Sequence, residues 1–123
     1  MAKTVAVIGA SSDRRKFGNK ALRAFARQGL TVLAINPNEA EVEGYRTYAS
    51  VLDVPGAIDM ASLYVPPHVG VQVVEELARK GVGEVWLNPG ADGPEVVRRA
   101  RALGLNTIQA CSIMALGHSP WSD

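Results

Sequence analysis

The feature that most constrains the fold is a series of short, nearly continuous apolar runs, separated by segments with helical patterning. The apolar residues in each run follow one another and do not alternate with polar ones. This pattern is typical of parallel strands that helices cover on both faces. The sequence therefore predicts five strands, at Thr4–Gly9, Thr31–Asn36, Ile58–Val65, Glu84–Leu87 and Asn106–Ala110.

The segments between these runs carry apolar residues at helical spacing and end at glycines, which commonly terminate helices. They predict helices over Lys20–Gln28, Val69–Lys80 and Pro94–Leu103, and we expect a short helix around Ser112–Leu116. The alternation of strands and helices with short connections predicts an α/β fold with a doubly wound, mostly parallel sheet.

Residues 36–54, NPNEAEVEGYRTYASVLDV, are too long for a simple turn. We expect a short strand near Arg46–Tyr48 and a helical turn near Ala49–Asp53 within them. No repeat, low-complexity stretch or linker divides the 123 residues, a length that fits a single domain. We expect the tail, about 117–123, to be loosely attached.

The composition excludes several functional classes. A net charge of +1 argues against nucleic-acid binding, which needs many clustered cations. One cysteine and two histidines argue against disulfides and a Cys/His metal site. No apolar segment reaches the length of a membrane span, and the first residues resemble a strand and not a signal peptide. We expect a soluble cytoplasmic protein without a metal.

Four unusual tripeptides indicate where a ligand would bind. Ligands of doubly wound sheets lie outside the carboxyl ends of the strands, where the strand order reverses. Every unusual tripeptide of the sequence sits there: Gly9-Ala10-Ser11, Asn36-Pro37-Asn38, Val65-Pro66-Pro67 and Asn88-Pro89-Gly90. This convergence predicts a ligand site at that edge of the sheet.

The loop after the first strand does not fit the usual nucleotide motifs. The dinucleotide fingerprint needs a close series of glycines, but Ser11 and Arg14 stand at two of those positions. An NAD site also favours an acidic residue at the end of the second strand, where this chain has Asn36. A Walker A motif is absent.

The same loop nevertheless suits a phosphate. It offers two serine hydroxyls, free backbone N–H groups, the positive end of the following helix, local cations and a small residue for close approach. The alternative is a solvated loop in which a serine or Asp13 merely caps the helix. The residues that would hold the phosphate are Ser11, Ser12, Arg14, Arg15, Lys16 and Gly18.

These pieces together resemble the small stand-alone CoA-binding proteins. Their domain is related to the CoA-binding part of the succinyl-CoA synthetase alpha subunit and of ADP-forming acetyl-CoA synthetases. The resemblance covers residues 4–116 and rests on ordered segments, namely VIGASSDRRKFGNKAL, INPNEAEVEGYRTYASVLDVPGAID, SLYVPPHVGVQVVEELARKGVGEVWLNPGA and the cysteine in QACSIM.

The resemblance implies a Rossmann-like fold that binds coenzyme A. In that family the loop at Gly9–Gly18, which includes Ala10 and Phe17, wraps the phosphates. Asn36 and Pro37 would lie beside the nucleotide. The resemblance further implies that Val65 and Pro66 shape the adenosine pocket, and that Asn88, Pro89 and Gly90 face the same crevice.

Two departures from the family pattern limit which properties of the family can be expected of this chain. The synthetases have a lysine shortly after the second-strand proline, where this chain has Asn38 and Glu39. The 3′-phosphate would then depend on the cluster Arg14–Lys16 or be held less tightly. The synthetases also carry their phosphorylated histidine on a separate domain, which this chain does not reach. Ligase activity is therefore not expected of this chain by itself.

Single residues add little to the site. His68 is expected at a surface helix start and His118 in the tail. Cys111 is expected as a small buried apolar residue, with a mixed disulfide to CoA as the alternative. Trp86 and Tyr64 are expected in the core, although Tyr64 could instead stack near an adenine.

The sequence thus predicts a domain that binds CoA or an acyl-CoA without catalysing a reaction, as a carrier, sensor or partner subunit. The alternatives are an NAD(H)-binding redox sensor, a subunit of a split acyl-CoA ligase, and a scaffold with an empty crevice. A protein partner or a homo-oligomer is left open.

Overall fold

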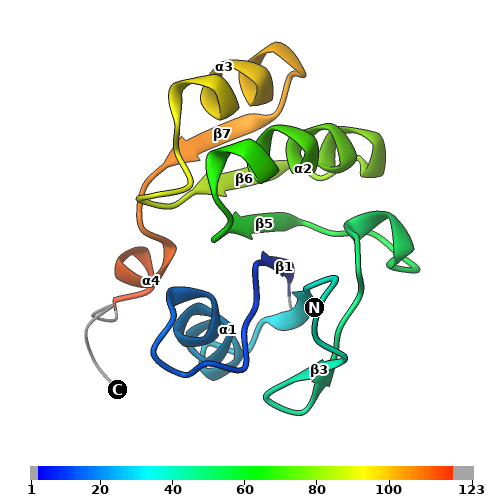
Figure 1. Ribbon diagram of the computed structural model, residues 1–123, viewed down its shortest axis with the longest axis vertical. Coiled ribbons are helices and arrows are strands. Elements are labelled where there is room, and N and C mark those ends of the chain that lie inside the picture. The colour runs from blue at the N-terminus through cyan, green and yellow to red at the C-terminus, as the bar shows by residue number, and fades with distance from the viewer. Residues whose placement is uncertain (1–2, 118–123) are drawn as a thin grey trace.

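The computed structural model describes residues 3–117, whose main feature is a five-stranded sheet of order β2-β1-β5-β6-β7 (Figure 1). All neighbouring strands of this sheet pair in parallel. This arrangement confirms the predicted doubly wound parallel sheet. The strands are β1 (Thr4–Ile8), β2 (Thr31–Ile35), β5 (Met60–Leu63), β6 (Glu84–Leu87) and β7 (Asn106–Gln109).

Helices cover both faces of the sheet (Figure 1), which explains why β1 and β2 are almost continuously apolar, whereas the edge strand β7 carries three polar residues. α1 (Phe17–Arg27) and α4 (Ser112–Ala115) lie on one face, and α2 (Pro67–Lys80) and α3 (Pro94–Ala102) lie on the other. Val5 and Val7 of β1 belong to the core beneath α1. Ala6 and Ile8 belong to the core beneath α2 and α3.

The segment between β2 and β5 differs from its prediction. It forms a small antiparallel hairpin of β3 (Glu41–Val42) and β4 (Tyr45–Arg46), and then a 3-10 turn, η1 (Val51–Asp53). Glu43 and Gly44 both adopt positive φ, at 48° and 82°, as this two-residue turn requires. The expected helical turn is confirmed. The strand expected near Arg46–Tyr48 is correct only in part, because Tyr48 makes just an isolated bridge to Ile35.

Two helices begin earlier than expected. α1 starts at Phe17 and not at Lys20, and α2 starts at Pro67 and not at Val69. Gly18 weakens the helical signal in the sequence, but its packing against the strand end, described below, stabilises the first turn of α1. Proline is favourable at the first helical position, where its missing N–H is not needed.

The register of the strands places their ends at one edge. Ile8 of β1 pairs with Ile35 of β2 and with Leu63 of β5. The chain runs outward from β1 to β2 and then returns to the other side of β1 as β5. The strand order therefore reverses between β1 and β5, which is where such sheets bind ligands.

Two expectations concern residues that are not described. His118 and the tail beyond residue 117 lie outside the described part of the chain. Of the helices within residues 3–117, none has the length and apolar character that crossing a bilayer requires.

Candidate functional site

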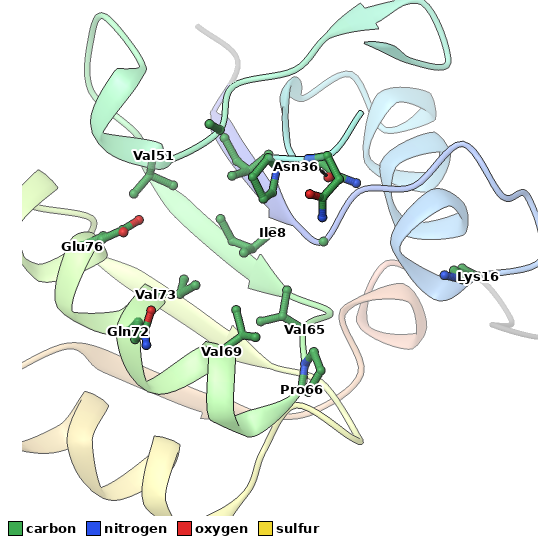
Figure 2. A pocket seen from close by; sticks show the side chains of 15 residues that line it. Ile8, Lys16, Asn36, Val51, Val65, Pro66, Val69, Gln72, Val73 and Glu76 are labelled. Atoms are coloured by element: carbon green, nitrogen blue, oxygen red, sulfur yellow. Dashed lines mark hydrogen bonds between the residues drawn. The ribbon is translucent and has the colours of Figure 1, made fainter. Parts of the chain in front are cut away.

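A cavity of about 510 Å³ opens at the point where the strand order reverses (Figure 2). Its size is typical of small-molecule sites. The ends of β1, β2 and β5, the turn around η1 and one side of α2 form its wall. Its lining consists of Ile8, Gly9, Lys16, Ile35, Asn36, Pro37, Asn38, Ala49, Val51, Val65, Pro66, Val69, Gln72, Val73 and Glu76.

The cavity contains part of the predicted site. Gly9, Lys16 and the pairs Asn36-Pro37 and Val65-Pro66 line it, as three separate strand ends converge there. The other predicted site residues are not in this lining. They are Ala10, Ser11, Ser12, Arg14, Arg15, Phe17, Gly18, Asn88, Pro89 and Gly90.

Sequence reasoning missed the contribution of α2. Val69, Gln72, Val73 and Glu76 form one stripe of this helix, because residues three and four apart share a face. Figure 2 shows these side chains along one side of the cavity. The sequence does carry a signal for this wall, since the polar residues Gln72 and Glu76 interrupt an apolar stripe in the helix that begins at Pro67. The stripe gives the cavity apolar walls with an amide and a carboxylate.

Two glycines bring the first loop close to the sheet. Gly9 has φ +90°, and a Cβ there would lie 2.9 Å from the carbonyl oxygen of Tyr64. A Cβ on Gly18 would lie 2.2 Å from the carbonyl oxygen of Gly9. Both positions require glycine. The first turn of α1 consequently packs directly on the end of β1, and the helix start points at the cavity edge.

The start of α1 has no side-chain cap. Its N-cap residue is Lys16, and no acidic residue lies in its first turn. Ser11 and Asp13 form local turns instead, in which the Ser11 hydroxyl accepts from the Asp13 N–H at 3.1 Å. The alternative that a serine or Asp13 caps this helix is therefore wrong. The positive end of the helix dipole remains available to an anion.

Two of the three residues in the basic cluster Arg14–Lys16 form ion pairs with carboxylates. Arg14 Nε lies 3.3 Å from Oε2 of Glu43, and Arg15 donates to both carboxylate oxygens of Asp13 at 3.0 Å. The hydrogen bonds from Arg15 lower the pKa of Asp13 to about 2. Within residues 3–117, Lys16 makes no such pair, and it lines the cavity. Lys16 is thus the cation best placed to meet a ligand there.

Asn36 organises the second strand end. Its Nδ2 donates to the carbonyl oxygen of Ala10 at 2.7 Å, and its Oδ1 accepts from the N–H of Asn38 at 2.7 Å. The first contact ties the β1 loop to the β2 loop. The second is an Asx turn that encloses Pro37, and Pro37 lines the cavity.

Asn88 is buried, and its side chain holds neighbouring elements of the fold together. Its side chain is 2% exposed, and its Nδ2 donates at 2.9 Å to the Ser62 hydroxyl and to the Leu63 carbonyl. Its Oδ1 accepts from the N–H of Ser112 at 2.8 Å. The amide therefore joins β5, the end of β6 and α4. Pro89 and Gly90 follow it as exposed residues.

The remaining candidates lie away from the cavity lining. His68 is exposed on the first turn of α2. Cys111 and Tyr64 are partly buried against the core beneath α1, and Trp86 is half-buried. Burial raises the pKa of Tyr64 to about 12, and its hydroxyl makes no hydrogen bond to the described residues. Among those residues, no cluster of three or more His, Cys, Asp or Glu could hold a metal ion.

Comparison with known proteins decides the family. The model of the family described as "CoA binding domain" matches residues 3–117. This chain belongs to that CoA-binding family. The match covers the whole cavity and every element of the sheet, and the resemblance seen in the sequence is confirmed.

The CoA-binding domain is also similar to parts of much longer enzymes. It is 40% identical over 89 residues to acetate–CoA ligase [ADP-forming] I of Archaeoglobus fulgidus, covering 72% of this chain and 13% of the ligase. It is 37% identical over 122 residues to acetate–CoA ligase [ADP-forming] I subunit alpha of Pyrococcus furiosus. That match covers 86% of this chain and 26% of the subunit.

Solved structures share the fold. A hypothetical protein from Pyrococcus horikoshii OT3 matches with a TM-score of 0.87 and 30% identity, over 94% of this CoA-binding domain and 81% of that chain. The dinucleotide-forming acetyl-coenzyme A synthetase 1 of Ca. Korarchaeum cryptofilum, in its apo form, matches with a TM-score of 0.77 and 29% identity. Here 88% of this chain and 26% of that chain are covered.

Proposed function

We propose that this domain binds coenzyme A or an acyl-CoA, with the adenosine in the cavity and the diphosphate at the β1–α1 loop. The observation that carries this proposal is the position of the cavity. The cavity has apolar walls suited to a nucleoside, and it borders the uncapped start of α1, which suits a phosphate. Membership in the CoA-binding family supports coenzyme A as the ligand.

The nucleoside would lie between the β2 end and the α2 stripe. Val65, Val69 and Val73 offer an apolar surface, and Gln72 and Glu76 can hydrogen-bond to polar edges of a base. The diphosphate would then reach the first turn of α1, where Lys16 is the nearest available cation. The pantetheine arm would extend outward along the strand ends.

Binding without catalysis is part of the proposal. The cavity lining contains no cysteine, histidine, serine or aspartate in the described chain, and its one carboxylate, Glu76, accepts a hydrogen bond from Ser50 at 2.6 Å. Ser50 itself lies outside the lining, and its hydroxyl also accepts from the Leu52 N–H at 3.1 Å as the N-cap of η1, which is a structural role. The domain would act as a carrier, a sensor or a partner subunit.

A subunit of a split acyl-CoA ligase is the second candidate. It is favoured because a relative, acetate–CoA ligase [ADP-forming] I subunit alpha of Pyrococcus furiosus, is itself one subunit of a ligase. In that case turnover would require a second chain. Acyl-CoA formation by the mixture and not by either chain alone would support this candidate, whereas the isolated domain would bind CoA in both cases.

A titration followed by two-dimensional NMR tests the proposed orientation. Adenosine alone should shift the amides of the α2 stripe, and inorganic pyrophosphate alone should shift amides of residues 9–18. CoA should shift both sets. Lys16→Ala should weaken CoA binding several-fold, because a charge-assisted contact is lost. Lys3→Ala is the matched control, since Lys3 precedes β1 at the opposite edge of the sheet. Shifts confined to other surfaces would contradict the proposal.

A further inference from the structure

A carboxylate from the β2–β3 connection occupies the donors of the β1–α1 loop. Oε2 of Glu39 accepts from the backbone N–H of Ser12 at 3.2 Å, and Oε1 accepts from the Ser12 hydroxyl. The same Oε2 accepts from Nδ2 of Asn36 at 3.3 Å. Glu39 is thereby held by one backbone donor and two side-chain donors of the predicted site.

A second carboxylate from the same segment binds the same loop. Glu43 lies at the turn of the β3–β4 hairpin, and its Oε2 contacts Arg14 Nε at 3.3 Å and Asn19 Nδ2 at 3.1 Å. Asn19 in turn donates to the carbonyl oxygen of Ser11 at 2.8 Å. The segment between β2 and β4 thus places two negative charges against a loop suited to phosphate.

Carboxylate and phosphate oxygens compete for the same donors. A backbone N–H can direct its hydrogen to one strong acceptor, and two anions at adjacent positions repel each other. The hydrogen bonds from Ser12 also lower the pKa of Glu39, so its side chain is charged at neutral pH. A phosphate can reach the Ser12 donors only when the Glu39 carboxylate leaves them.

We propose that Glu39 is an internal competitor that occupies the phosphate-binding donors of Ser12 and lowers the affinity of the site for every ligand whose phosphate must displace it. The inference rests on the proposed function, since it assumes that the diphosphate binds this loop. A ligand with only weak phosphate contacts would not displace Glu39. Ligands with a full set of contacts elsewhere in the cavity would displace it, but each would bind less tightly than it would without the carboxylate.

Glu39→Gln tests this directly, because the amide has nearly the same shape without the charge. The matched control is Glu41→Gln, which removes the same charge from an exposed position two residues along the chain. Isothermal titration calorimetry with CoA, inorganic pyrophosphate and adenosine measures each variant. Thermal unfolding checks that both variants are folded.

Glu39→Gln should bind CoA and pyrophosphate about tenfold more tightly than the wild type, as expected for losing one charged competitor. Adenosine, which lacks phosphate, should bind all three proteins equally. Glu41→Gln should leave every affinity within about twofold, since an exposed charge outside the loop is screened.

The other outcomes are equally decisive. Weaker or unchanged pyrophosphate binding by Glu39→Gln would overturn the proposal and indicate that Glu39 orders the loop. A tenfold gain for adenosine as well would show a general change of the cavity, which also overturns it. If pyrophosphate binding rises as expected but no variant binds CoA, the proposed function fails and the competition by Glu39 stands.

Discussion

Replacing Gly18 by alanine is the most stringent test of how the first loop packs. A Cβ at this position would lie 2.2 Å from the carbonyl oxygen of Gly9. The two groups must separate by about 1 Å before the contact is tolerable. The added Cβ is bonded to the backbone of α1 and the oxygen is itself a backbone atom, so no flexible side chain can move aside to relieve the contact. The start of α1 must therefore move away from β1.

The expected magnitude combines two opposing effects. Alanine is favoured over glycine within a helix by about 1 kcal/mol. Forcing an extra carbon into a filled position costs about 1–3 kcal/mol, and a backbone contact belongs at the upper end of that range. We expect Gly18→Ala to lower the free energy of unfolding by about 2 kcal/mol, which for a domain of this size lowers the melting temperature by about 5–10 °C.

Thermal unfolding of Gly18→Ala and of a matched control measures this effect. Gly83→Ala is the control, because a Cβ there would meet its nearest atom, the carbonyl oxygen of Asp59, at 3.7 Å. It should unfold at or slightly above the wild-type temperature, since alanine restricts the unfolded chain. If Gly18→Ala is as stable as the wild type, the proposed close contact between α1 and the end of β1 is refuted.

The remaining predictions concern three buried or charged side chains, Asn88, Tyr64 and Asp13. Asn88→Ala should lower the free energy of unfolding by about 2–4 kcal/mol in a denaturant titration, because it leaves buried partners without hydrogen bonds; a smaller loss than 1 kcal/mol would contradict this. Tyr64→Phe should unfold at or above the wild-type temperature, since the buried hydroxyl makes no hydrogen bond to any residue within 3–117. The raised pKa of Tyr64 further predicts that stability falls as the pH rises from 10 towards 12, a fall that Tyr64→Phe should reduce. The pKa of Asp13 is lowered to about 2, so its contribution to folding stability is present above the ordinary value of 3.8 and is lost as the pH falls through about 2. Asp13→Asn should therefore reduce the loss of thermal stability between pH 3.8 and pH 2.

The sheet was predictable because its signals are local. The strands β1 and β2 are short apolar runs, and α2 is followed by Gly81 in the left-handed conformation. The boundaries were less predictable where packing overrides local preference. Gly18 argues against helix in the sequence, but its contact with Gly9 places it inside α1. The β3–β4 hairpin was missed because each strand is only two residues long.

The site was predictable to the extent that strand ends determine it. Asn36-Pro37 and Val65-Pro66 line the cavity because the register brings their strands to one edge. The ion pair of Arg14 could not be inferred, since its partner Glu43 lies far away in the sequence, whereas Asp13, the partner of Arg15, is only two residues away. The contact between Glu39 and Ser12 was hidden for the same reason, and the two residues are 27 positions apart.

Titration calorimetry of the wild-type protein with CoA, dephospho-CoA, ATP and NADH tests the central claim most directly. The account predicts saturable binding of CoA that is stronger than the binding of NADH, because the loop lacks the dinucleotide glycines and Asn36 stands where an NAD site favours a carboxylate. No heat of binding at near-millimolar CoA, or a preference for NADH, would contradict it.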